Sequence, residues 1–307
     1  MNIKPVCILC LISRAYREIQ YSTQDTDVQL QAMREVLRTV NSIVNEQSHP
    51  MHLVPAYIGT RRDRVIRRIT GCSDPYHDQK IKSNKIALEL RPDLEKIIGR
   101  EHDSYRRLRA ACMAAIVGNI IEFDVLGHRF KLEEVSKILS RAEEELAIDD
   151  IPVLYDKIKK GTRVLYLTDN AGEIALDVLL VRELRRLGAE VTVAVKEKPV
   201  LNDATEEDAQ AVGMVEAADR VITTGADTVG LILQECSETL KKHYTGSDLI
   251  IAKGMGHLET MTGAHVEHPA DVFFLLRTKC DPVAACLGVE RNKNVAKYLP
   301  AGQPLEC

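Results

Sequence analysis

The sequence predicts an α/β protein in which a Rossmann-like α/β/α parallel-sheet domain follows an all-helical N-terminal region. Apolar residues keep a helical spacing through most of residues 13–147, and no convincing strand precedes Ile151. From Thr162 onward, short apolar runs alternate with helical segments, which is typical of a parallel sheet covered on both faces. The segment 149–161 between the two parts is short and charged, so we expect the parts to pack together.

These patterns divide the chain into a helical region, residues 1–150, and a Rossmann-like domain, residues 151–307. The helical region shows its period in apolar positions such as Leu30, Met33 and Val36. Turn signals separate its segments, and no internal repeat is visible. The predicted strands are residues 163–168, 190–195, 220–223, 248–252 and 271–276.

The charge of the chain bears on which partners it could bind. The 307 residues carry a net charge of -4, which gives no sign of a nucleic-acid or anionic-membrane partner. The local exception is a basic cluster, which we interpret as a solvated helix face, with an RNA-contacting patch as the less favoured alternative. Its members are Arg61, Arg62, Arg64, Arg67 and Arg68.

The N-terminal apolar run, Val6 to Ile12, is too short to span a bilayer and lacks a small-residue cleavage site. No other segment is long enough, so we expect a cytoplasmic protein. Eight cysteines without a secretion signal argue against a disulfide framework. We therefore expect free thiols, metal ligands or both.

Polar residues gather directly after the predicted strands. In an open parallel sheet, ligands bind at the carboxyl ends of the strands, so these residues are the candidates for a site. In chain order they are Asp169, Asn170, Gly172 and Glu173; Lys196, Asn202 and Asp203; Lys253, Gly254, Gly256, His257 and Glu259; and Lys279 and Cys280.

The residue types at this edge predict a chemistry. Asp169, Asn170 and Asp203 are hard oxygen donors, which suit Mg²⁺ or Mn²⁺. The turn at Gly172 leads into a helix, whose free backbone N–H groups would form an anion site. Lys253 and Lys279 would neutralise phosphate oxygens as charge builds in the transition state. Together these features favour metal-dependent hydrolysis of a phosphate monoester.

Other interpretations remain open at this level. An Asp-Asn pair after a strand is also a good helix N-cap, and Asp203 likewise resembles a helix start. A Rossmann-like methyltransferase is one alternative function, although no G-x-G-x-x-G follows the first strand. A non-catalytic metal- or metabolite-binding protein is another.

Four ordered motifs then match a known family. LYLTDNAGEIALD, KEKPVLNDATEED, IIAKGMGHLET and LLRTKCDPVAACLG resemble the domain-of-unknown-function 89 family, also called the damage-control phosphatase family. The N-terminal part resembles it through CILC, GCSDPYHDQK and VGNIIEFD. The chain most resembles the microbial subfamily with an N-terminal CxxC.

The resemblance implies a divalent metal, Mn, Co, Ni or Mg, held by Asp169, Asn170 and Asp203. It implies that residues 151–307 form the catalytic domain and hydrolyse sugar phosphates or damaged phosphometabolites. Lys253 and Lys279 would face the phosphate. Of the strand-end residues, we expect Gly172, Glu173, Gly254, His257 and Glu259 to contact the substrate. The resemblance adds Asp74 and Asn119 as walls of the cleft between the two parts. His257-Leu258 departs from the family pattern of Asn followed by an aromatic residue.

The CxxC pair, Cys7 and Cys10, is a signal for soft-metal binding, with Cys280 or Cys72 as a third ligand. Zinc at the cysteines is one interpretation, and a pair of buried thiols is the other. His257 would lie beside the proposed phosphate. The expected partner is a small phosphorylated metabolite, whose identity the sequence does not give.

Overall fold

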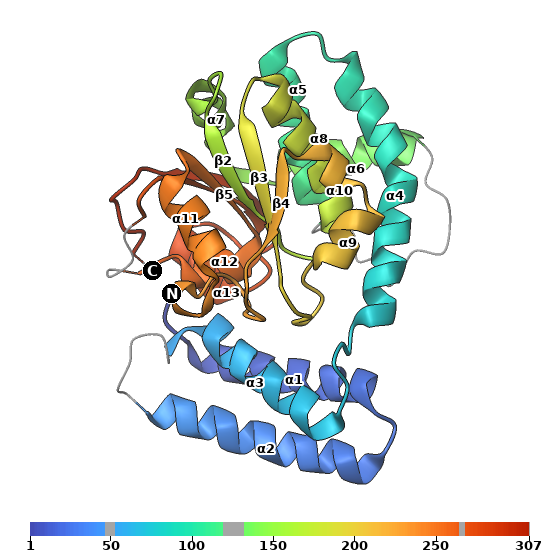
Figure 1. Cartoon of the computed structure of the whole chain (residues 1–307), viewed down its shortest axis with the longest axis vertical. Helices are drawn as coiled ribbons and strands as arrows, with labels where there is room; N and C mark the ends of the chain where they lie inside the picture. The colour runs from blue at the N-terminus through green and yellow to red at the C-terminus, as the bar shows by residue number, and fades with distance from the viewer. Residues whose placement is uncertain (47–52, 119–131, 264–267, 307) are drawn as a thin grey trace.

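The computed structural model describes residues 1–46, 53–118, 132–263 and 268–306, which form a seven-stranded sheet with helices on both faces (Figure 1). The sheet order is β1-β7-β6-β5-β2-β3-β4. The strands are β1 (Leu146–Asp149), β2 (Arg163–Leu167), β3 (Glu190–Val195), β4 (Arg220–Thr223), β5 (Leu249–Lys253), β6 (Asp271–Arg277) and β7 (Asn294–Leu299). The helices are α1 (Pro5–Ser22), α2 (Thr26–Asn45), α3 (Pro55–Thr70), α4 (His77–Arg100), α5 (Ser104–Val117), α6 (Leu132–Glu144), α7 (Ile151–Lys157), α8 (Glu173–Arg186), α9 (Glu206–Ala211), α10 (Met214–Ala217), α11 (Glu238–Gly246), α12 (Gly254–Thr260) and α13 (Asp281–Leu287).

Helices α1, α2 and α3 pack on one another around their own apolar cluster, which includes Ile19, Val36 and Ile58. Local sequence sets their ends: α3 begins with Pro55, and its C-cap is Gly71 at φ 71°. Figure 1 shows the three helices as a separate layer, drawn in blue, beside one edge of the α/β part.

Helices α4, α5 and α6 belong instead to the sheet domain. They share one apolar cluster with α8 and with one face of the sheet, and α5 packs directly on α8. Strand β1 lies in the sheet as well, paired in parallel with β7. The expectation of no strand before Ile151 was therefore wrong, and packing places the change of architecture after α3 rather than at residue 150.

The five predicted strands are all present, with ends that agree within one residue. β2, β3, β4, β5 and β6 pair in parallel, as predicted. The sequence did not indicate β7, which pairs antiparallel with β6. The second face of the sheet packs on α11, α12 and α13.

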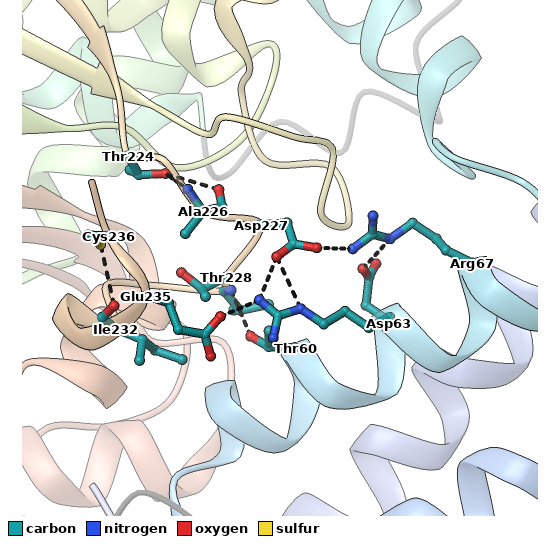
Figure 2. A network of polar contacts seen from close by, with 12 residues as sticks. Thr60, Asp63, Arg67, Thr224, Ala226, Asp227, Thr228, Ile232, Glu235 and Cys236 are labelled. Carbon is teal, nitrogen blue, oxygen red and sulfur yellow. Dashed lines mark hydrogen bonds and ion pairs between the residues drawn. The ribbon is translucent and has the colours of Figure 1, made fainter. Parts of the chain in front are cut away.

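The basic cluster on α3 is an ion-pair network, which corrects the solvated-face interpretation. Arg62 is 1 % exposed and donates to buried Glu18 at 2.9 Å. Arg64 and Arg67 both bind Asp227, in the loop between β4 and α11, and Arg64 also binds Glu235. Figure 2 shows how this loop lies against α3. Only Arg61 and Arg68 are largely exposed, as expected.

Among the described residues, no helix combines the length and apolar character needed to cross a membrane.

Candidate active site

Two loops at the carboxyl edge of the sheet meet through backbone hydrogen bonds. Asn170 and Asp203 form an isolated antiparallel bridge. The Ala171 N–H donates to the carbonyl of Asn202 at 2.9 Å, and the Ala204 N–H donates to that of Asp169 at 2.8 Å. The residues after β2 and after β3 are therefore held side by side by the main chain, as the strand-end argument predicted.

Neither Asp169-Asn170 nor Asp203 caps a helix. The N-cap of α8 is Gly172, and the N-cap of α9 is Thr205, which exchanges hydrogen bonds with Asp208. The capping interpretation of the Asp-Asn pair therefore does not account for these side chains.

The side chains at the bridge form a polar group. The Asn170 amide nitrogen donates to Asp169 Oδ2 at 3.0 Å and to Glu173 Oε1 at 2.6 Å. With its nitrogen engaged, Asn170 has its amide oxygen to offer a cation. Glu173 is 2 % exposed, and Asp203 is 4 % exposed. Three carboxylates, those of Asp169, Glu173 and Asp203, and the amide oxygen of Asn170 thus gather at one point of the sheet edge.

Burial and mutual repulsion disfavour the charged forms of these acids. Burial, together with the negative charges of Glu173 and Asp203, raises the pKa of Asp169 well above its ordinary value. Burial also raises the pKa of Asp203 to about 6, although the Lys196 ammonium acts in the opposite direction. Lys196 Nζ lies 3.5 Å from Asp203 Oδ2 and donates to the carbonyl of Gly230 at 2.7 Å.

Gly254 fits closely against Asp169. Its φ of 78° lies in the left-handed region, and a Cβ at this position would lie 2.0 Å from Asp169 Oδ2. A side chain would collide with the carboxylate, so the glycine lets the start of α12 approach the site.

Lys253, which the resemblance implied would face the phosphate, binds groups of the protein interior. It is 1 % exposed, and its ammonium donates to Asp177 Oδ1 at 2.7 Å and to the carbonyl of Ala115 at 3.0 Å. Asp177 also accepts from Tyr166 at 2.7 Å. Since its donors already have buried partners, Lys253 supports the site from behind, 3.6 Å from Glu173 Oε2.

The backbone N–H of Gly172, which we expected to bind an anion, is already bound to a side chain. The Gly172 N–H donates to Asn84 Oδ1 at 2.7 Å, and the Asn84 nitrogen donates to Asp208 at 2.7 Å. Lys80 lies 3.6 Å from Asp208 and 2.7 Å from Asp74. Asp74 therefore contacts the site only indirectly, through Lys80, Asp208 and Asn84. Asn119, the other predicted cleft wall, lies outside the described residues.

His257 is buried and neutral. Burial and the positive charges of Lys196 and Lys253 lower its pKa to about 3. Its Nδ1 lies 2.7 Å from the carbonyl of Lys253, which can only accept, so Nδ1 carries the proton and Nε2 holds a lone pair. The histidine thus keeps a defined tautomer at the start of α12.

A cavity of about 320 Å³ opens beside the site, between α1, α3, α12 and the loop after β6. Leu201, which precedes Asn202-Asp203, lines it, and so does Lys279, whose positive charge acts on Asp169. Further lining side chains are Arg14, Arg62, Met255, Glu259 and Arg291. Burial raises the pKa of Glu259 to about 7, partly opposed by Arg14 and the N-terminal ammonium.

The three candidate soft-metal ligands line this same cavity. Cys7 is buried, Cys280 is half-buried and Cys10 is exposed. Within the described residues, no group of three or more His, Cys, Asp or Glu side chains is arranged to hold a metal. The Asp169–Asn170–Asp203 set has two carboxylates and an amide, so it is not such a group. Cys286 is disulfide-bonded, contrary to the expectation of free thiols or metal ligands.

Three positions at the site were not singled out from the sequence. Asn84 binds Gly172, Asp177 binds Lys253, and Asp63 accepts from the N–H of Leu201 at 3.3 Å. Asn84 and Asp63 lie on helices that are far in sequence from the residues they bind. Asp177 lies within α8, and its sequence neighbours do not distinguish it from other polar helix residues. Lys196 was predicted as a strand-end residue, but its contact with Asp203 was not.

The fold and this edge define a Rossmann-like α/β protein with an acidic, oxygen-rich group of side chains at the carboxyl ends of its strands. Comparison with known proteins is more specific. Residues 3–295 match the damage-control phosphatase ARMT1-like domain, so the chain belongs to that family. The resemblance in its motifs is thereby confirmed.

Individual relatives agree. A damage-control phosphatase of Archaeoglobus fulgidus is 35% identical over 302 residues, covering 97% of this chain and 100% of the relative. One of Pyrococcus horikoshii is 32% identical, covering 95% and 96%. The crystal structure of a DUF89 family protein from Pyrococcus horikoshii superposes with a TM-score of 0.83 at 31% identity, covering 99% of this chain and all of the other.

Proposed function

We propose that this protein is a divalent-metal-dependent phosphatase that hydrolyses phosphate monoesters of small metabolites. The observation that carries the proposal is the backbone bridge between Asn170 and Asp203, which brings Asp169, Asn170 and Asp203 to one point. The relatives named damage-control phosphatases support the reaction class.

The residues present fit a hard divalent cation. Asp169, Asn170 and Asp203 offer oxygen atoms only, which suits Mg²⁺ or Mn²⁺ and also accommodates Co²⁺ or Ni²⁺. Burial and repulsion between the acids disfavour their charged forms, and a cation would offset both. Nearby, Glu173 Oε2 is buried and has no hydrogen-bond partner among the described residues, although the Lys253 ammonium lies 3.6 Å away. These features favour a site that is completed by positive charge.

When bound, the cation supplies charge neutralisation at the phosphoryl group. Lys279, on the cavity side of Asp169, would contact the phosphate oxygens that face away from the acids. Lys253 and Asp177 hold Glu173 and α8 in place from the interior. His257, at the start of α12, is neutral, and its Nε2 lone pair can accept a hydrogen bond.

The cavity supports a small, anionic and hydroxylated substrate. Arg14, Lys279 and Arg291 bring positive charge to its wall, and Glu259 offers a carboxyl group that can accept hydrogen bonds from hydroxyls. Sugar phosphates and damaged phosphometabolites have these properties. We therefore place the phosphoryl group at Asp169 and Asp203 and the remainder of the metabolite in the cavity.

Phosphate release from a panel of sugar phosphates, with Mn²⁺ and after exhaustive chelation, tests the proposal. We expect turnover that requires the metal and is abolished in Asp169→Ala and in Asp203→Ala. Asp248→Ala is the matched control, because Asp248 precedes β5 at the opposite edge and binds Arg163. Full turnover after chelation, or near wild-type turnover of either site variant at saturating Mn²⁺, would show that the assignment is wrong. Metal binding without turnover on any substrate would favour a non-catalytic metal-binding protein.

A further inference from the structure

The turn that delivers Asp203 is strained. Of the described residues, only Leu201 and Asn292 combine a side chain with a positive φ, and the φ of Leu201 is 49°. The Asp203 N–H donates to the carbonyl of Val200 at 3.1 Å, so residues 200–203 form a tight turn with Leu201 at its second position. A leucine in this region costs on the order of 1–3 kcal/mol and persists only where its surroundings enforce it.

One side chain outside the sheet domain contacts this turn. Asp63 lies on α3, has no exposed surface, and accepts the Leu201 N–H through Oδ1 at 3.3 Å. Its other oxygen accepts from Arg67 Nε at 2.7 Å. Arg67 in turn binds Asp227, as Figure 2 shows. The carboxylate is therefore held on one side by α3 and binds the turn on the other.

We infer that Asp63 is a positioning residue, which holds the strained turn at Leu201 so that Asp203 meets Asp169 and Asn170. The inference rests on the proposed function for the role of Asp203. It assigns the α1–α3 layer a part in forming the metal site, although no ligand comes from that layer.

The geometry explains why a carboxylate serves here. The Leu201 N–H is buried, and an unpaired buried donor would cost about 1–3 kcal/mol. A charged acceptor gives a stronger hydrogen bond than a neutral one, and Arg67 offsets the buried charge. Losing Asp63 would remove the partner of the turn, and Leu201 would relax toward a negative φ. The Asp203 carboxylate would then move away from Asp169.

Metal-free protein gives the first test, by hydrogen exchange across residues 200–205. We expect Asp63→Ala to speed exchange there on the order of tenfold, the effect of one lost hydrogen bond to a charged acceptor. Asp63→Asn keeps one acceptor oxygen for the Leu201 N–H but loses the charge and the second acceptor that faces Arg67, so its exchange should lie between wild type and Asp63→Ala. Thr60→Val is the matched control: Thr60 is buried on α3 and accepts the half-buried N–H of Val229 at 2.9 Å, in a loop without a proposed ligand.

Mn²⁺ affinity by calorimetry gives the second test. We expect Asp63→Ala to weaken binding roughly ten- to a hundredfold, as loss of a group that orients a ligand does. Thr60→Val should leave the affinity unchanged. Adding Leu201→Asn to Asp63→Ala should restore part of it, because asparagine adopts positive φ more readily than leucine.

The outcomes separate the two proposals. Unchanged exchange at residues 200–205 in Asp63→Ala, or an equal change in Thr60→Val, would refute the positioning role whatever the metal does. Wild-type protein that binds no divalent metal and releases no phosphate would refute the proposed function, and the exchange data would still decide whether Asp63 holds the turn. If Asp63→Ala binds Mn²⁺ like wild type while wild type is active, the function stands and the inference fails.

Discussion

Two helical regions of this chain are attached to the sheet by different forces. α5 packs on α8 through side chains with no exposed surface, such as Ala111, Ala115 and Ile116, inside the main apolar cluster. α3 meets the loop after β4 through charged groups, with Arg64 and Arg67 on Asp227. The first contact extends the core, and the second is a polar seam between two separately packed layers.

The difference has a functional meaning. Apolar burial is strong but non-directional, so it fixes α5 without specifying where a single atom lies. Hydrogen bonds from charged groups are directional, and Asp63 uses one to set the turn that precedes Asp203. We therefore expect the apolar contact to govern stability and the polar seam to govern the geometry of the site.

The largest effect should come from the apolar contact. Truncating Ile116 to alanine leaves a cavity in a fully buried position, and we expect a loss of about 2–5 kcal/mol in the free energy of unfolding. Urea denaturation measures it. Mn²⁺ affinity of the folded fraction should stay at the wild-type value, and a large drop in affinity would contradict the division drawn here.

A smaller effect should come from the seam. Asp227→Asn removes the charge shared by Arg64 and Arg67, which are partly exposed, so we expect a loss of about 1–2 kcal/mol, between the values of surface and buried ion pairs. The same denaturation experiment measures it. Arg38→Met, which breaks an exposed pair with Glu35 within α2, should change nothing and serves as the control.

The smallest effect concerns pH. Burial alone would raise the pKa of Asp227, but hydrogen bonds from Arg64 and Arg67 outweigh it and hold the pKa below its ordinary value. The stability from this group is therefore present above the unfolded pKa of about 3.9 and is lost as pH falls through the lower folded value. The difference in unfolding free energy between wild type and Asp227→Asn should shrink from pH 7 to pH 3. A difference that grows toward low pH would mean that another group dominates the seam.

Local patterns predicted much of the site. The apolar runs located five strands, and the strand-end rule selected Asp169, Asn170 and Asp203, which the backbone bridge then joins. The patterns failed where the partner of a residue is distant in sequence. Lys253 has the expected position, but Asp177 and the carbonyl of Ala115 already engage its ammonium.

The two missed strands have the same explanation. β1 is only four residues long and follows directly on the helical segment that includes α6. So short a segment does not show the alternation of apolar and polar residues that marks a strand. β7 alternates poorly, because it is buried on several consecutive positions between β6 and β1. Each is a strand because neighbours supply its hydrogen bonds.

By itself, the sequence determined the fold class, the order of the main strands and the acids that follow them, because periodicity and strand ends are local properties. Only the tertiary structure decided which groups those acids meet. It placed Asp63 of α3 beneath the turn at Leu201 and Asn84 of α4 on Gly172, since contacts across more than eighty residues leave no local pattern in the chain.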